Sequence, residues 1–414
     1  MTRQNLPLRS AAFGLLAIAS AVFVGMITAV TVNETRNPAV AVAIGVGPQG
    51  QALSRLAFGQ VERAGAKRPN APVEQVVSRR DVAMARAAYS DEPLAVGALA
   101  MIAMGAENAG QEEKARQIYR ASTRLSRRSP LIMAWLVRDY AQRNEENNVF
   151  QSLSRLIRTA PETQAIYIPM LAQGLERKSS VEAMAPLLGT GPAWRVGFWR
   201  EVAGRPNSLR YGALLRARIT EDPWRQRQIS ETDRELLAAM VVSGYFEDAA
   251  SLARRLRGRA AASKSLIVNG DFSGNRVVLT PFDWQFFSGG DFGADLDEKA
   301  SALDVSALPE VDGLIARQLI DAAPGRYRLS WRAVDGVAPT SGGLRASLQC
   351  AEPGKQIVLP PVSLAKSRGA QDLSVPDSCR WYWLNLEIEP SDPGEGLDLA
   401  LDAISLQRVV QTAK

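Results

Sequence analysis

The stretch "GRYRLSWRAVDG", residues 325–336, predicts a β-strand with one face in a core and the other in water. Successive side chains of a strand point to opposite sides, and here the two sides differ in polarity. The apolar side carries Tyr327, Leu329, Trp331 and Ala333, and the polar side carries Arg328, Ser330 and Arg332. This alternation is typical of an antiparallel sheet that packs on a core with one face.

Similar short runs extend over residues 264–410, where turn signals separate them. The signals stand at Ser288-Gly289-Gly290, Pro324-Gly325, Ser341-Gly342-Gly343, Pro353-Gly354 and Asp392-Pro393-Gly394. A domain of this length with many short strands is typical of an all-β sandwich. The charge changes at the same place, because residues 265–414 hold 13 basic and 20 acidic side chains whereas residues 1–264 hold 36 and 23. We therefore expect separate folding units of opposite net charge.

Within residues 264–410 the chain resembles the jelly-roll carbohydrate-binding modules of the galactose-binding-like class. The resemblance rests on "LIVNGDF" (266–272) at the domain start, "FDW" (282–284), "GRYRLSW" (325–331) and "LALDAISLQRV" (399–409) in the closing strand. It implies a jelly-roll sandwich whose opening loop lies beside the closing strand, often around a structural calcium ion. These motifs mark a fold more than a ligand, since many members of the class bind no sugar.

The resemblance makes Asp271 and Asp402 candidate calcium ligands, with Asn269 contributing its carbonyl oxygen. The residue types suit the ion, because carboxylates supply hard oxygen ligands and a tight Asn-Gly turn frees backbone carbonyls. The alternative is that the three residues form hydrogen-bonded turns and hold no metal. We expect no other cofactor.

The strand "CRWYWLNLEIEP", residues 379–390, predicts a sugar-binding platform. Its core set is Tyr382, Leu384, Leu386 and Ile388, so Trp381, Trp383, Asn385 and Glu387 should share the opposite, exposed face. Indole rings cover the apolar C–H patches of a sugar while planar polar groups take its hydroxyls. Arg328 and Arg332, which are also expected on a solvent-exposed face, are candidates for contacts with an acidic polysaccharide. The alternative is that a neighbouring layer buries the two tryptophans.

Residues 51–262 are rich in Ala, Leu, Arg and Glu at helical spacing and predict an all-α domain. One predicted helix pair breaks at Asn108-Ala109-Gly110, and the next begins at Pro130 and ends at Pro161. The spacing is close to the roughly 34-residue period of helix-turn-helix repeats, and residues 85–262 resemble degenerate tetratricopeptide repeats. Such an array implies a surface for protein partners; the alternative is a helical spacer.

Residues 11–32, "AAFGLLAIASAVFVGMITAVTV", contain no charged side chain and are long enough to span a bilayer as a helix. Arg3 and Arg9 precede them, so residues 1–10 are expected in the cytoplasm and the rest of the chain outside. We expect an uncleaved signal anchor; a cleaved signal peptide, the alternative, would export the same residues. Residues 33–50 are expected to be a linker.

The composition excludes several classes of function. The 414 residues contain no histidine, which removes the Ser-His-Asp and Cys-His catalytic groups and the usual zinc ligands. The only cysteines, Cys350 and Cys379, are too few for a thiolate metal site and suffice for one disulfide in an oxidising compartment; the alternative is two buried free thiols. Acidic residues among the arginines, together with export, argue against nucleic acid as a partner.

These patterns predict a single-pass protein of a bacterial inner membrane, with most of the chain in the periplasm. We expect a non-enzymatic accessory factor in polysaccharide handling, which binds glycan through the sandwich and protein partners through the helices. One alternative is a purely structural scaffold. Another is a glycosidase or lyase, which needs paired carboxylates in a cleft, and no constellation in the sequence indicates such a pair.

Overall fold

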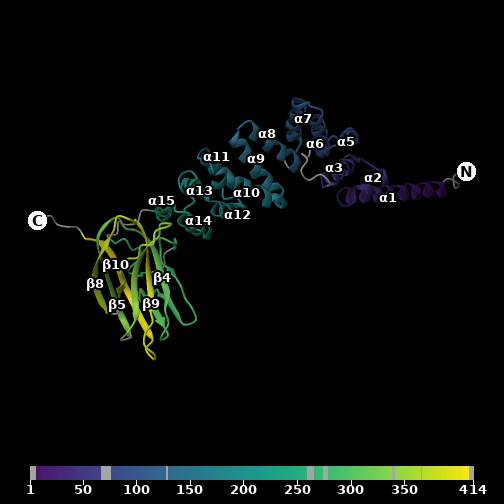
Figure 1. The fold of residues 1–414 in the computed structure, drawn as a ribbon. Helices are drawn as coiled ribbons and strands as arrows, with labels where there is room; N and C mark the ends of the chain where they lie inside the picture. The colour runs from purple at the N-terminus through teal and green to yellow at the C-terminus, as the bar shows by residue number, and fades with distance from the viewer. Residues whose placement is uncertain are drawn as a thin grey trace. The chain divides into compact units, whose positions relative to one another are not determined.

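The computed structural model describes residues 6–66, 76–126, 129–258, 265–273, 278–337, 341–364 and 366–409. In Figure 1, helices fill the N-terminal part of the chain and two antiparallel sheets fill the C-terminal part, as predicted. The chain divides into two compact units, residues 1–167 and 168–414. The division therefore lies within the helical region and not at the change from helices to strands near residue 263, so the last helices belong with the sandwich.

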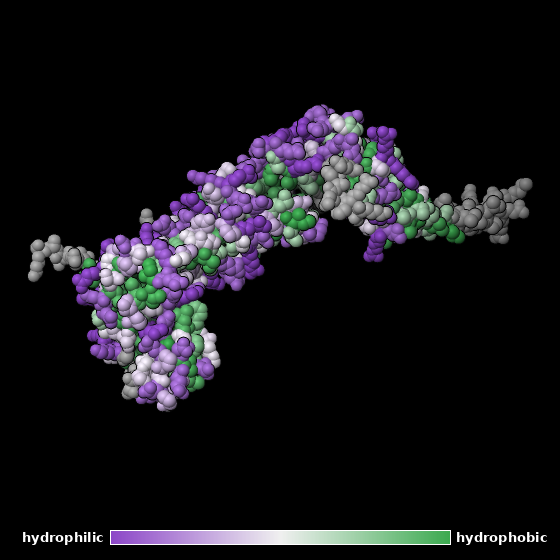
Figure 2. Space-filling view, viewed as in Figure 1, coloured by the Kyte–Doolittle hydropathy of each residue, from purple (hydrophilic) through white to green (hydrophobic). Residues whose placement is uncertain are grey.

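The first unit begins with an apolar helix, α1 (Leu6–Arg36), which is long and apolar enough over residues 17–36 to cross a membrane. Large apolar side chains are exposed on it, including Ile18, Val22, Phe23 and Val24, and Figure 2 shows this apolar surface near the N-terminal end. The predicted linker 33–50 is largely helical, since α1 runs on and α2 (Pro38–Ile44) follows. Pro38 at the first turn of α2 and Gly45 in the left-handed conformation after it account for this short helix.

Helix pairs follow, with breaks where the sequence predicted them. The elements are α3 (Gly50–Ala66), α5 (Arg79–Asp91), α6 (Val96–Asn108), α7 (Glu112–Leu125), α8 (Pro130–Gln142), α9 (Glu146–Thr159) and the 3-10 turn η1 (Pro161–Thr163). Gly110, with a φ of +72°, makes the turn between α6 and α7. Tyr119 of α7 stacks on Trp135 of α8 with ring centroids 4.1 Å apart, which joins one helix pair to the next.

The helices of the second unit form two layers. They are α10 (Gln164–Gly174), which crosses the boundary, α11 (Ser179–Gly189), α12 (Arg195–Ala203), α13 (Pro206–Arg218), α14 (Glu231–Val242) and α15 (Phe246–Arg257). Helix α13 contacts both α11 and α15, whereas α12 contacts α14, so alternate helices lie in the same layer. The predicted all-α region is therefore helical, and its resemblance to tetratricopeptide repeats stays a prediction.

The sandwich consists of two antiparallel sheets, each with five strands among the described residues. The first, which we call the β9 sheet, has the order β1 (Gln285–Phe286), β4 (Gly313–Asp321), β9 (Trp381–Glu389), β6 (Gly343–Cys350) and β7 (Val362–Ser363). The second, the β5 sheet, has the order β2 (Phe292–Asp297), β3 (Ala302–Ala307), β10 (Leu397–Arg408), β5 (Gly325–Val337) and β8 (Arg368–Val375). The core lies between them and includes Tyr327, Leu329 and Trp331 of β5, as the alternation predicted.

The opening loop, residues 266–272, joins the two sheets. The buried Gln318 side chain of β4 bonds both the backbone N–H and the carbonyl of Val268, while the Gly270 carbonyl accepts from the Ile404 N–H of β10. A Cβ atom on Gly270 would lie 2.1 Å from the Ile404 carbonyl oxygen, so only glycine fits here. Phe272 is fully buried beside Trp284. The loop therefore lies beside the closing strand, as the resemblance implied.

Acidic residues gather on the outer face of the β5 sheet. Asp295 of β2 lies directly opposite Asp304 of β3, and Asp398 of β10 is close by. Partial desolvation raises the pKa of Asp304, and the carboxylates of Asp297, Asp398 and Asp295 raise it further. Like charges directly opposite one another destabilise a sheet.

We therefore expect Asp304→Asn to raise the free energy of unfolding by about 0.2–1 kcal/mol at neutral pH. The folded-state pKa is raised, so the repulsion is complete above it and is relieved as the pH falls through it. Thermal unfolding at several pH values checks this: the gain should be present at pH 7 and vanish in acid. An equal gain at every pH would show that charge is not the cause.

Candidate glycan-binding face

Strand β9 has the two faces that its sequence predicted. Its core set, Tyr382, Leu384, Leu386 and Ile388, is buried between the sheets. Trp381, Trp383, Asn385 and Glu387 therefore lie on the outer face of the β9 sheet. Less of this face is exposed to solvent than predicted, because of these four residues only Trp383 and Glu387 are partly exposed.

The prediction that Trp381 is exposed is wrong. The side chain is 5% exposed, because Phe246 of α15 stacks on its ring at 5.6 Å and Phe282 meets it edge-on at 6.3 Å. Leu319, which is 2% exposed, belongs to the same outer face. Trp381 thus serves the contact between helix and sheet, and its ring faces are not available to a sugar.

Charged groups hold the same contact between α15 and the sandwich. Arg380 donates to both oxygens of Asp321, at 2.7 and 2.9 Å, and to Glu247 of α15 at 3.0 Å. A second ion pair joins Arg257 of α15 to Asp283 at 2.6 Å. The last helix is therefore attached by one aromatic stack and by ion pairs near both of its ends.

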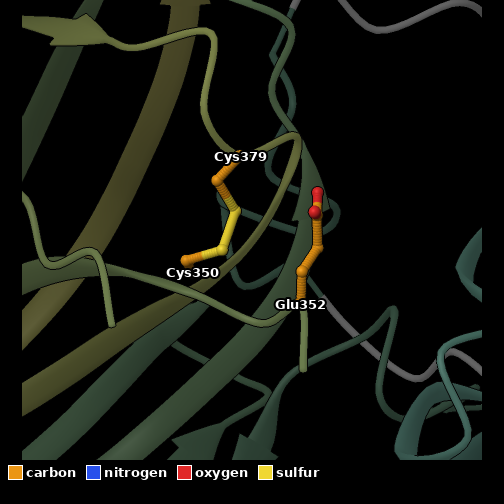
Figure 3. A group of neighbouring side chains, drawn as sticks. All are labelled: Cys350, Glu352 and Cys379. Atoms are coloured by element: carbon orange, nitrogen blue, oxygen red, sulfur yellow. A yellow bond between two sulfur atoms is a disulfide. The ribbon is translucent and has the colours of Figure 1, made fainter. Parts of the chain in front are cut away.

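The two cysteines form a disulfide next to this contact, with an S–S distance of 2.06 Å. Figure 3 shows the Glu352 side chain beside the bridge. Glu352 accepts from Lys355 Nζ at 2.6 Å and from the Arg380 N–H at 2.8 Å. The Lys355 ammonium, helped by the backbone N–H groups of Arg380 and Trp381, holds the pKa of Glu352 below its ordinary value. Although the two sulfurs and this carboxylate lie within 4.8 Å of one another, oxidised sulfurs are not thiolate ligands, so the group is not a metal site.

Trp383 belongs to a cluster that the sequence did not indicate. The Arg317 guanidinium of β4 lies over the Trp383 ring, 4.3 Å from its centroid, and 5.4 Å from the centroid of Phe287. Arg317 Nε donates to Gln285 Oε1 of β1 at 2.7 Å. We call Gln285, Phe287, Arg317 and Trp383 the Trp383 cluster. It combines an indole, an amide and a guanidinium, which are groups that recognise sugars.

The other two candidates of this face lie beside the cluster. Asn385 pairs in register with Arg317 and is 5% exposed, so the prediction that it is exposed is wrong. Glu387 is held by Arg345 of β6, whose Nε donates to it at 2.9 Å while its Nη1 donates to Glu389 at 2.8 Å. Two carboxylates thus share one arginine at the edge of the cluster.

Arg328 and Arg332 lie elsewhere, on the outer face of the β5 sheet. Both are exposed, and each has a carboxylate partner: Arg328 Nε lies 2.8 Å from Asp372 and Arg332 Nε lies 2.6 Å from Asp402. The Arg328 guanidinium, with Arg326 beside it, holds the pKa of Asp372 below its ordinary value. These arginines do not share a face with Trp383, so the predicted glycan residues do not form one site.

Two of the three calcium candidates have other partners in the structure. Both carboxylate oxygens of Asp402 accept from Arg332, at 2.9 and 2.6 Å, and Asp271 accepts from its neighbour Ser273 at 2.8 Å. Only the Asn269 side-chain oxygen is buried without a partner. Calcium takes six to eight oxygen ligands, and a carboxylate bound by a guanidinium is a poor candidate for one of them. The arrangement does not favour the calcium hypothesis, which stays a prediction.

Arg317, Gln285 and Phe287 were missed because three strands bring them together. Gln285 pairs with Arg317, and Arg317 pairs with Asn385. The available signal was the polar residues within two apolar runs, "WQFF" (284–287) and "LIARQLI" (314–320). Neither run shows on its own which strand will be its neighbour.

No family model and no curated protein matches the chain. Among solved structures, the chain is similar to TmCBM61, determined in complex with β-1,4-galactotriose. The identity is 14%, the match covers 36% of this chain and 100% of that one, and the TM-score is 0.23. A likeness at this TM-score has no bearing on the function of the present chain.

Proposed function

We propose that this protein is a membrane-anchored, exported accessory factor that binds a polysaccharide through the outer face of the β9 sheet. The Trp383 cluster carries the proposal, because it places an indole, a guanidinium and an amide on one partly exposed sheet face. The helix pairs offer a surface for protein partners. Calcium, if bound, would have a structural role only.

The proposed location rests on two features. An apolar N-terminal helix with exposed side chains suits a signal anchor, and positive charge before it suits a cytoplasmic N-terminus. The Cys350–Cys379 disulfide suits an oxidising compartment such as the periplasm. We therefore propose a single-pass protein of a bacterial inner membrane with its bulk in the periplasm.

A scaffold without a sugar ligand is the second candidate. The observation that favours it is the burial of Trp381 under Phe246, which makes one of the two β9 indoles a structural contact. In that case the sandwich would cap the helical array and the Trp383 cluster would be a stabilising contact. The two candidates differ in one measurable property, which is sugar binding that depends on Trp383.

Trp383→Ala tests the choice. The full chain, purified in detergent micelles, is titrated calorimetrically with a panel of neutral and acidic polysaccharides: dextran, galactomannan, hyaluronan, alginate and polygalacturonate. If Trp383 is a binding residue, the substitution should weaken the affinity for the polymer that binds by about 30-fold, as for a buried aromatic anchor.

Trp224→Ala is the matched control. Trp224 is also a partly exposed indole with an arginine, Arg218, over its ring at 4.9 Å, but it lies among the helices. It should leave the affinity unchanged. If no polymer of the panel binds, or if both variants behave alike, the glycan proposal is wrong and the scaffold is favoured.

A further inference from the structure

Arg317 is the partly buried arginine of the sandwich that has no carboxylate partner among the described residues. It contacts the two aromatic rings and Gln285. By contrast, each of five others forms an ion pair: Arg326, Arg328, Arg332, Arg345 and Arg380. The side chain is also partly buried, and desolvation lowers its pKa. A guanidinium remains charged even so, and a half-desolvated charge without a counterion is costly.

The cluster leaves part of the guanidinium available. Nε is used by Gln285 and the flat face by Trp383, whereas neither terminal amino group has a partner among the described residues. These two groups form a planar fork that matches the two oxygens of a carboxylate. The rings restrict the rotation of the fork, so less conformational entropy is lost when a ligand binds.

The surroundings favour a singly charged anion over a more highly charged one. Arg345 faces two carboxylates, Glu387 and Glu389, so the neighbouring group carries a net negative charge. A phosphate group with two charges would be repelled by it about twice as strongly as a carboxylate with one. Glu387 and Glu389 would remain as hydrogen-bond acceptors for sugar hydroxyls.

The other sheet does not offer an equivalent place, because Arg368, an exposed arginine without a carboxylate partner, has no aromatic ring against it among the described residues. On the outer face of the β5 sheet, Arg328 and Arg332 are already paired with aspartates, and Asp295, Asp304 and Asp398 add negative charge. An acidic polymer would gain little there. Among the described residues the charge pattern therefore directs a sugar carboxylate to the β9 sheet.

From this geometry we infer that the ligand of the β9 sheet is a uronic-acid-containing polysaccharide whose carboxylate is bound by Arg317. The inference rests on the proposed function and adds the class of ligand to it. The bond to the carboxylate would be charge-assisted and bidentate, with Trp383 against the sugar ring and Gln285 fixing the orientation of the guanidinium.

The test compares polyuronates with their carboxyl-reduced forms, which keep the sugar ring and lose the charge. Hyaluronan, alginate and polygalacturonate, each in both forms, are titrated against the full chain in detergent micelles. At least one polyuronate should bind about tenfold or more tightly than its reduced form. Arg317→Gln should remove this preference, and Arg317→Lys, which keeps the charge without the fork, should retain only part of it.

Arg368→Gln is the control, since Arg368 is an exposed arginine of the β5 sheet, and it should keep the full preference. Thermal unfolding of each variant verifies that it is folded. If only neutral polymers bind, or if Arg317→Gln keeps the preference, the inference is wrong while the proposed function stands. If neither acidic nor neutral polymers bind, both are wrong.

Discussion

Replacing Trp381 by alanine is expected to lower the free energy of unfolding of the second unit by about 3–5 kcal/mol, the range for a buried tryptophan. The indole is 5% exposed and lies between Phe246 of α15 and Phe282 of the sandwich. Alanine would leave a cavity bounded by rings that belong to two different elements, and these cannot collapse onto each other without moving α15. Urea unfolding of the full chain in micelles measures the loss.

The location of the loss is as informative as its size. Hydrogen–deuterium exchange should accelerate in α15 and in the strands β4 and β9 of Trp381→Ala, whereas helices of the first unit should keep their protection. Phe246→Ala should destabilise the same segments. The double variant should lose less free energy of unfolding than the sum of the two single variants, because each single variant already removes the contact between the two rings. Full additivity would show that Trp381 and Phe246 do not stabilise each other.

Trp383→Ala is the natural comparison, since the two residues share one face of one strand. Trp383 is partly exposed, so its removal should cost less stability than the removal of Trp381. We expect the two variants to separate, with Trp381→Ala impaired in stability and Trp383→Ala impaired in sugar binding. A platform made of both indoles, as the sequence alone predicted, would instead make both variants lose binding.

The sequence sufficed to predict which way each β9 side chain points but not what lies in front of it. Alternation is a local property, and it assigned Tyr382 to the core and Trp381 to the outer face correctly. The burial of Trp381 depends on Phe246, which is far away along the chain in a helix. A pattern within one strand contains no information about such a contact.

The same limit applies to the candidate site. The helix breaks were predictable, because Gly110 and Pro130 determine the conformation of the backbone next to them in the sequence. Arg317 was not, because its role follows from strand order: β1 on one side of β4 and β9 on the other. The opening loop is a third case. Its motif correctly implied a contact with the closing strand β10, but Asp271 and Asp402, the acidic residues proposed to bind calcium, have other hydrogen-bond partners.

Removing the disulfide is expected to have the second large effect. The bridge closes a loop with a sequence separation of 29 residues, and chain entropy alone predicts a loss of about 3.6 kcal/mol for a loop of this length. The measurement is urea unfolding of the full chain in micelles with the double variant Cys350→Ala, Cys379→Ala. The unmodified chain in reducing buffer is the companion sample, because it opens the bridge and leaves the side chains in place. Equal unfolding midpoints with and without the bridge would contradict the expectation.

Sugar binding should survive this loss, and that outcome separates the two regions of the β9 sheet. A disulfide acts mainly by restricting the unfolded chain, so the folded variant keeps its strand pairs. The Trp383 cluster is positioned by the ladders β1–β4 and β4–β9, in which Gln285, Arg317 and Asn385 pair directly, and not by the bridge. Below the unfolding transition, the double variant should therefore bind polysaccharide as tightly as the unmodified chain. If affinity fell together with stability, the position of the cluster would depend on the contact that holds α15, and binding at the sheet would be coupled to the helices.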